Sequence, residues 1–573
     1  MSDPYAPIHC ERRGHDAVTH LFGLSTAWVC QGSAGRRKGE AMRRLASLVL
    51  FEFCMLALSA FAQHEGHESV GRVPREILER PVPLRQGIGK VHEEVTTSSP
   101  KAQAFYDQGL AYLHSFVWIE AARSFHQALR FEPSLAMAYL GLSDVDIGLQ
   151  DVLGARVAFE KAQSLAGKVS ERERARIIIR ARQLDYLEDS GNLQKYFAYR
   201  QAISDALVAS SNDPWLWILR GFADEGTPFA HGQGGGVDTI GFYETALAFS
   251  PDNFAAHHYL AHTFENLSPT KEALEQSEAY VRLAPAIPHA HHMHGHDLRR
   301  LGRTEEAIQE FLKAEELENA YYRAEKIPAQ YDWHHAHNLE LLAMSYQALG
   351  QMKAAEAVFR EAFSLPACTD FAEFNRRAWL EFLLDRGRAQ EALAESQDLV
   401  KSRWALGRFA GHTLAGRALL AMNRMEDARS ELALVEQEMG HLPASVIGSL
   451  PNAGALRAEI LLREKKWDEG NELMKHIEEK IGVVPGPDAW SAALFQLESI
   501  AQVARQVGDW ELAEFTARRM IQHDRSYAGG HYALGLVAEH QGDAATARME
   551  FATAEKLWSK ADSDLARPRI QNP

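Results

Sequence analysis

Small and apolar residues recur along most of this chain at the spacing of paired amphipathic helices. In the first clear stretch, residues 102–135, the recurring positions are Gly109, Tyr112, Ala121, Phe125 and Ala128, with Pro133 near the end. Separations of three, four and seven residues place side chains on one face of an α-helix. Proline cannot continue a helix and starts a turn. The pattern therefore predicts two helices that pack on each other through one face each.

The same 34-residue pattern returns in register farther along the chain. Clear units begin at 136, 288, 336 and 528, and weaker units begin near 254, 373, 409, 451 and 494. In the unit from 288, Gly295 and Phe311 hold the positions of Gly109 and Phe125. One helix pair cannot bury its apolar face alone, so successive pairs stack. We expect an all-α fold, an α-solenoid of helix-turn-helix repeats.

The repeated positions are those of the tetratricopeptide-repeat (TPR) family, which the chain resembles. Within that family it is similar to a group of exported bacterial proteins through AMAYLG at 136–141, HYLAH at 258–262 and HMHGHDLRRLG at 292–302. This second likeness covers roughly residues 90–370. The resemblance implies a right-handed superhelix with a concave groove, and it supplies no established activity.

Breaks in the repeat pattern divide the chain into segments. In order, we expect an upstream extension (1–41), a signal peptide (42–62), a flexible lead-in (63–100), two repeats (101–169), an irregular helical insert (170–253), histidine-rich repeats (254–321), an insertion (322–335), C-terminal repeats (336–561) and a disordered tail (562–573).

An export signal is predicted ahead of the repeats. From Met42, two arginines lead into the apolar stretch LASLVLFEFCMLALSA, which closes on a small-x-small triplet ending at Ala62. These are the three parts of a secretory signal peptide. The alternative is a short membrane anchor, but the run is nearer 16 than 20 residues and contains Glu52. We expect Met42 to be the true start, with a mature periplasmic or extracellular chain from Gln63 that has no membrane span.

Charge and cysteine content narrow the classes of partner. The formal net charge of −16 argues against nucleic acid, because binding to phosphates needs a basic face. Three of the four cysteines lie in the first 54 residues, and only Cys368 remains beyond them. One thiol builds neither a disulfide framework nor a cysteine zinc site.

Histidine is concentrated in one part of the chain, with 11 of the 26 between His257 and His337. In a TPR, positions 2, 5, 9 and 12 of the first helix line the groove, because the helical period places them on one stripe. The candidate metal ligands at positions 5 and 9 are His258, His262, His292 and His296. The further groove-lining residues are Glu265, His289, His337 and Glu340.

Two consecutive first helices thus offer H-x-x-x-H on the same inner face. Histidines four residues apart can share an ion, and stacked helices lie about 8–10 Å apart, within reach of a shared site. Imidazole with carboxylate support suits Zn²⁺, Cu²⁺ or non-haem iron. The alternative is that these histidines are polar groove residues that contact a peptide. With ordinary pKa values near 6.5 they would become charged together below about pH 6.

The sequence carries no recognised catalytic motif. The loop HGQGGG at 231–236 lacks the Lys-Ser/Thr pair of a phosphate-binding loop and follows no predicted strand. His257, His291 and His294 fall at positions normally packed between helices, where structural roles are expected. We therefore expect a scaffold that binds a peptide or protein partner in its groove. The alternative is a metal- or small-ligand-binding protein, or a metalloenzyme, that uses the groove histidines.

Overall fold

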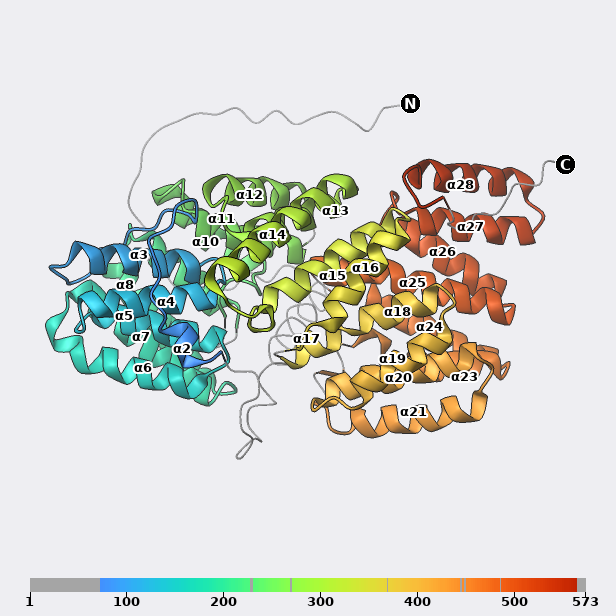
Figure 1. The fold of residues 1–573 in the computed structure, drawn as a ribbon, viewed down its shortest axis with the longest axis horizontal. Coiled ribbons are helices and arrows are strands. Elements are labelled where there is room, and N and C mark those ends of the chain that lie inside the picture. Colours follow the sequence, from blue (N-terminus) through green and yellow to red (C-terminus); the bar gives the residue numbers. More distant parts are fainter. Residues whose placement is uncertain are drawn as a thin grey trace, which may run out of the picture. The chain divides into compact units, whose positions relative to one another are not determined.

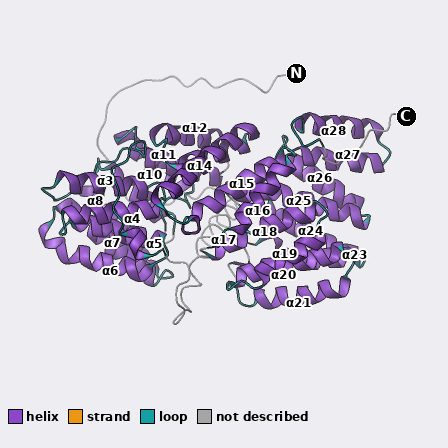
Figure 2. Ribbon diagram, viewed as in Figure 1, coloured by secondary structure: helices purple, strands orange, loops and turns teal. Residues whose placement is uncertain are grey.

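The computed structural model describes residues 73–226, 230–267, 270–367, 369–443, 446–447, 450–484 and 486–563. The expected signal peptide at 42–62, its start at Met42, and Cys368 lie outside these residues. Every regular element among the described residues is a helix, and no strand occurs among them (Figure 2). No helix in this part of the chain has the length and apolar character needed to cross a membrane.

The helices follow one another along the chain (Figure 1). The first group is α2 (Arg75–Leu78), α3 (Pro100–Leu113), α4 (Trp118–Phe131), α5 (Ala136–Gly148), α6 (Val152–Leu165), α7 (Glu171–Glu188), α8 (Leu193–Ala209), α9 (Pro214–Asp224) and α10 (Val237–Phe249). The middle group is α11 (Phe254–Leu267), α12 (Thr270–Leu283), α13 (Pro288–Arg300), α14 (Thr304–Glu325), α15 (Trp333–Ala348), α16 (Met352–Ser364), α17 (Asp370–Asn375) and α18 (Arg377–Asp385). The last group is α19 (Ala389–Val400), α20 (Ala405–Ala421), α21 (Met425–Met439), α23 (Ala455–Arg463), α24 (Trp467–Ile481), α25 (Pro487–Val507), α26 (Trp510–His523), α27 (Ala528–His540) and α28 (Ala544–Leu557).

Consecutive helices pack as pairs, as the repeat pattern predicts. Among the most extensive contacts are those within the pairs α3–α4, α5–α6, α11–α12, α13–α14, α15–α16 and α27–α28. Each pair also contacts the next, through α4–α5, α12–α13 and α14–α15 for example. This is the α-solenoid arrangement expected from the 34-residue period.

A glycine at position 8 of three repeats, Gly109, Gly295 and Gly535, lets the two helices of the pair approach closely. A Cβ added to Gly109 would lie 2.5 Å from the Phe125 ring, and one added to Gly295 would lie 2.7 Å from Phe311. Both rings are buried. The glycine at position 8 therefore faces the aromatic ring at position 24 of its own repeat, and this contact explains why both positions recur.

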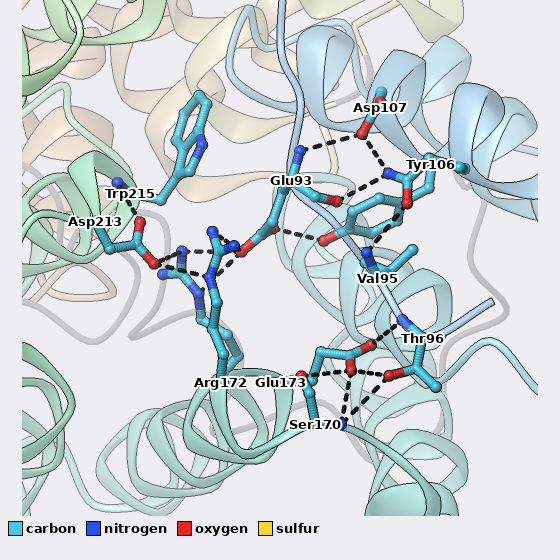
Figure 3. Close-up of polar contacts among 12 residues, drawn as sticks. Glu93, Val95, Thr96, Tyr106, Asp107, Ser170, Arg172, Glu173, Asp213 and Trp215 are labelled. Carbon is cyan, nitrogen blue, oxygen red and sulfur yellow. Dashed lines mark hydrogen bonds and ion pairs between the residues drawn. The ribbon is translucent and has the colours of Figure 1, made fainter. Parts of the chain in front are cut away.

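Residues 73–99 differ from the expected flexible lead-in, because ion pairs and buried contacts hold them on the repeats. The guanidinium of Arg172 lies 3.5 Å from a carboxylate oxygen of Glu93 and 3.0 Å from one of Asp213 (Figure 3). The backbone N–H of Thr96 donates to Glu173 at 2.9 Å. Apolar residues of the segment, such as Val82 and Ile88, lie in the core.

The region 170–253, expected as an irregular helical insert, folds into helices α7 to α10, and a capping box of Ser170 and Glu173 starts α7. The expected insertion at 322–335 is shorter, because α14 continues to Glu325 and α15 begins at Trp333.

The C-terminal helices contact the middle of the chain directly. Helix α25 contacts both α13 and α15. Arg299 of α13 makes a buried ion pair with Asp524 at 3.0 Å, and its guanidinium lies 5.2 Å from the ring centre of Trp490 in α25. These contacts join residues more than a hundred positions apart, which a solenoid with contacts only between neighbours would not do.

Candidate functional site

Seven histidine rings on three first helices lie in contact with one another. Helix α11 carries His258 and His262, and helix α13 carries His289, His292 and His296. Helix α15 adds His334 and His337. Each of the first two helices presents H-x-x-x-H, which places both rings on one face. Two groups among the described residues have ligand atoms that all lie within 4.8 Å of one another, and we name them the first triad (His258, His262 and His289) and the second triad (His292, His296 and His337).

In the first triad the three Nε2 atoms converge. The Nε2 of His258 lies 3.1 Å from the Nε2 of His262 and 3.0 Å from the Nε2 of His289. Zinc–imidazole bonds of 2.0–2.1 Å at a tetrahedral ion place two nitrogen atoms about 3.4 Å apart. The three nitrogens are therefore close to the spacing of a shared ion.

Hydrogen bonds on the far side of the rings fix which nitrogen carries the proton. The Nδ1 of His258 lies 2.8 Å from the backbone carbonyl of His114, which only accepts, so Nδ1–H is the donor. The Nδ1 of His262 lies 3.4 Å from a carboxylate oxygen of Glu265. The Nε2 of His258 then carries a lone pair that faces the Nε2 of His262 at 3.1 Å, where an ion shared by the two rings would lie. Such backing of Nδ1 is typical of metal-binding histidines.

The second triad lies directly beside the first. The ring centres of His289 and His292 are 5.8 Å apart, and His292 lies 4.2 Å from His296 and 4.9 Å from His337. Its outer hydrogen bonds follow the same plan. The Nδ1 of His292 lies 3.0 Å from the side-chain oxygen of Asn338, whose amide N–H donates to a backbone carbonyl.

Glu265 joins the two triads. One carboxylate oxygen lies 3.2 Å from the Nδ1 of His296, and the other lies 3.4 Å from the Nδ1 of His262. The side chain is fully buried. Burial alone would raise its pKa, but the hydrogen bonds from His262 and His296 lower the pKa to about 2. Glu265 is therefore an ionised acceptor that orients one ring in each triad.

Burial holds most of these imidazoles in the neutral form that binds metals. It lowers the pKa values of His258, His289 and His292 well below the ordinary value, and it lowers the pKa of His337 to about 4. The expectation that the groove histidines keep pKa values near 6.5 is therefore wrong for these four. The cause is the loss of hydration that a charged imidazolium would suffer in the packed site.

Aromatic side chains cover the first triad. The ring of Phe116 lies 4.6 Å from the ring centre of His258 and 5.3 Å from that of His289. Phe116 has a φ of 59°, a left-handed conformation that is strained for a bulky residue. His334 packs between the triads, with its Nδ1 bonded to Glu318, and its buried Nε2 has no hydrogen-bond partner within the residues that the structure describes.

A cavity of about 630 Å³ opens next to both triads. His262, His289, His292, His296 and His337 line it, as does Glu340. Burial raises the pKa of Glu340 to about 8, so this carboxyl is protonated at neutral pH. His258 and Glu265 do not line the cavity and lie behind the rings that do.

The structure separates the four predicted ligands into two pairs. His258 and His262 belong with His289, while His292 and His296 belong with His337. The two added rings were expected only to line the groove. One further residue beside the second triad, Asp488, follows too late in the sequence for repeat spacing to link it with the histidines, and no motif marks it.

Other histidines form a separate, structural set. In several repeats a histidine at position 4 directs its Nδ1 to a side chain 19 residues later, on the second helix of the same pair. The pairs of this kind are His257–Gln276, His291–Glu310, His412–Glu431 and His531–Glu550. These bonds hold the two helices of one repeat together, and none of these histidines belongs to a triad.

Comparison with known proteins bears on the fold. Residues 288–321 and 336–367 match the family model for the tetratricopeptide repeat. A search of the curated proteins found no match. Among solved structures, the human IFIT1 dimer with m7Gppp-AAAA is 12% identical over 82% of this chain and 92% of its own, with a TM-score of 0.32. The APC/C hetero-tetramer Cut9–Hcn1 is 11% identical over 80% of this chain and 94% of its own, with a TM-score of 0.30. The matched stretches, together with the register of helix pairs along the chain, show that this protein contains tetratricopeptide repeats within an α-solenoid.

Proposed function

We propose that this protein binds a divalent transition-metal ion at the first triad. The observation that carries the proposal is the convergence of three Nε2 atoms. The Nε2 atoms of His262 and His289 lie 3.1 Å and 3.0 Å from the Nε2 of His258. Three imidazoles leave one coordination position of a tetrahedral ion open. His262 and His289 also line the cavity, so that position faces space that a small molecule or a side chain of a partner can enter. Imidazole ligands suit Zn²⁺, Cu²⁺ and iron.

The test measures zinc bound to the full chain, purified without a histidine tag, stripped with a chelator, loaded with Zn²⁺ and dialysed. Elemental analysis should find at least one ion per chain, and His258→Ala should retain one ion fewer. His412→Ala is the matched control, because His412 is also buried and bonded to a carboxylate, at 2.7 Å, but belongs to neither triad. A wild-type chain without zinc, or a His258→Ala chain with undiminished zinc, would overturn the proposal.

A second function, binding of a peptide or protein partner, is favoured by the repeats and by the cavity. TPR proteins as a class act as interaction scaffolds, and the lining of this cavity comes from many helices. Trp333 lines it and has a buried indole N–H without a hydrogen-bond partner in the described part of the chain, which a peptide carbonyl would satisfy. Peptides selected from a random displayed library should lose binding to Trp333→Phe, which keeps the ring and removes the N–H. Equal binding to both chains would exclude this mode.

We further propose that the protein works outside the cytoplasm, after export directed by residues 42–62. The support is the order of charged, apolar and small residues in that segment. Expression of the chain from Met42 in a bacterial host should yield a periplasmic product that begins at Gln63. A full-length product in the cytoplasmic fraction would contradict this proposal.

A further inference from the structure

Asp488 meets the second triad from a distant part of the chain. It lies in the first turn of α25, 151 residues after His337. One carboxylate oxygen is 3.7 Å from the Nε2 of His296, and the other is 3.4 Å from the Nε2 of His337. The Nε2 of His296 and the Asp488 oxygen that lies 3.7 Å from it are both buried and have no hydrogen-bond partner among the described residues.

These separations are long for hydrogen bonds and suit two ligands of one ion. A direct N–H···O bond has a donor–acceptor distance of 2.7–3.2 Å. Two ligand atoms at 2.0–2.2 Å from a tetrahedral ion lie about 3.4 Å apart. An ion bound here would also satisfy the two unpartnered atoms, which otherwise lose their hydration without any compensation.

The outer hydrogen bonds prepare the second triad in the same way as the first. Asn338 accepts from the Nδ1–H of His292, and Glu265 accepts from the Nδ1–H of His296. A ring whose Nδ1–H donates in this way can offer its Nε2 lone pair to an ion. His337 places its own Nε2 beside Asp488.

We infer that the protein holds two divalent transition-metal ions, the second bound by His292, His296, His337 and Asp488. The inference rests on the proposed function of the first triad and extends it to a dinuclear centre. The second site offers three imidazole nitrogens that lie within 4.8 Å of one another, and Asp488 presents one carboxylate oxygen to His296 and the other to His337. With one of these oxygens as the fourth ligand, the set is that of a closed tetrahedral ion. The first site offers three and keeps a position for exchange at the cavity.

Glu265 couples the two sites. Because one of its oxygens accepts from the Nδ1–H of His296 and the other lies 3.4 Å from the Nδ1 of His262, a change of this one side chain disturbs a ligand of each ion. Loss of such an outer hydrogen bond typically lowers metal affinity roughly 10–100-fold. Glu265 is thus a positioning residue. Its replacement should weaken both sites, whereas the replacement of a ligand should remove only one.

The experiment counts tight Zn²⁺ sites per chain by titration and elemental analysis. The wild-type chain should bind two ions. His258→Ala should keep one, and the double variant His337→Ala/Asp488→Ala should also keep one, since each change removes a different site. Glu265→Gln should weaken both sites roughly 10–100-fold. His412→Ala should bind two ions as the wild type does.

Each other result has a definite consequence. One ion in the wild type, lost in His258→Ala, would overturn the second site and leave the proposed function standing. No ion in the wild type would overturn both. Two ions retained in His337→Ala/Asp488→Ala would exclude Asp488 and His337 as ligands. The side chain of Asp488 is 44% exposed, so Asp488→Ala alone serves as a variant that keeps the fold, and circular dichroism checks it.

Discussion

At the scale of single residues, burial sets the charge of the acids and bases that line the interior. Lost hydration lowers the pKa values of His258, His289, His292 and His337, whereas the neighbouring His262 and His296 lower the pKa of Glu265 to about 2. Glu225 is the opposite case. Its carboxyl oxygens accept bonds from the Gly234 N–H at 3.0 Å and the Tyr243 hydroxyl at 3.2 Å, but burial still raises its pKa to about 8.

This raised pKa predicts how stability depends on pH. An unfolded glutamic acid has an ordinary pKa near 4.5, so the folded chain binds a proton at Glu225 that the unfolded chain releases. The stability that this proton contributes is complete below about pH 4.5 and is lost as the pH rises through about 8. Glu225→Gln keeps a neutral acceptor at the site. We therefore expect the difference in unfolding temperature between Glu225→Gln and the wild type to grow in favour of the variant from pH 5 to pH 9. An exposed change, Glu160→Gln, should give no such trend.

At the scale of elements, the repeat depends on how closely two helices approach. The ring of Phe125 lies between two glycines, since a Cβ on Gly109 would come within 2.5 Å of it and a Cβ on Gly141 within 2.4 Å. The ring is fully buried and has no free side into which it can move.

Gly109→Ala should therefore destabilise the protein although alanine is the better helix former. Overpacking of a filled core costs about 1–3 kcal/mol, and the helix propensity of alanine offsets about 1 kcal/mol of it. Chemical denaturation should show a net loss in the free energy of unfolding, which Phe125→Leu in the same chain should partly restore. Gly241→Ala in α10 is the control, because nothing lies within 4 Å of its added Cβ and the change should stabilise. A rise in the free energy of unfolding of Gly109→Ala equal to that of Gly241→Ala would show that Gly109 is not needed for the close approach of the helices.

The same elements show how far the sequence predicts the structure. Position 8 and position 24 recur because they touch, so the 34-residue period was enough to predict helix pairs. H-x-x-x-H on α11 and α13 likewise predicted rings on one face of each helix, and the structure brings these rings close together. Division into two triads could not be predicted, because it depends on the rotation of α15 and on side-chain hydrogen bonds. Asp488 could not be predicted either, since long-range packing of α25 brings it to the site and no repeat position does.

At the scale of the whole molecule, the second ion would join helices that a solenoid keeps apart. Contacts of α13 and α15 with α25 close a long stretch of chain, and the buried Arg299–Asp524 pair stabilises that closure. An ion held by His292, His296, His337 and Asp488 adds bonds at the same place. A ligand that binds only the folded state stabilises it by about 2.7 kcal/mol when the free ligand concentration is a hundred times the Kd. Bound zinc should therefore slow the local unfolding of every helix that supplies a ligand.

Hydrogen exchange distinguishes this closure from stabilisation of the histidine helices alone. On loading with Zn²⁺, amides in α11, α13 and α25 of the wild type should all exchange more slowly. In Asp488→Ala the protection should persist in α11, which belongs to the first triad, and disappear in α25, whose remaining contacts with α13 do not involve an ion. Protection of α25 that is equal in both chains would mean that packing alone carries the connection, and that the metal acts only on the helices that hold the histidines.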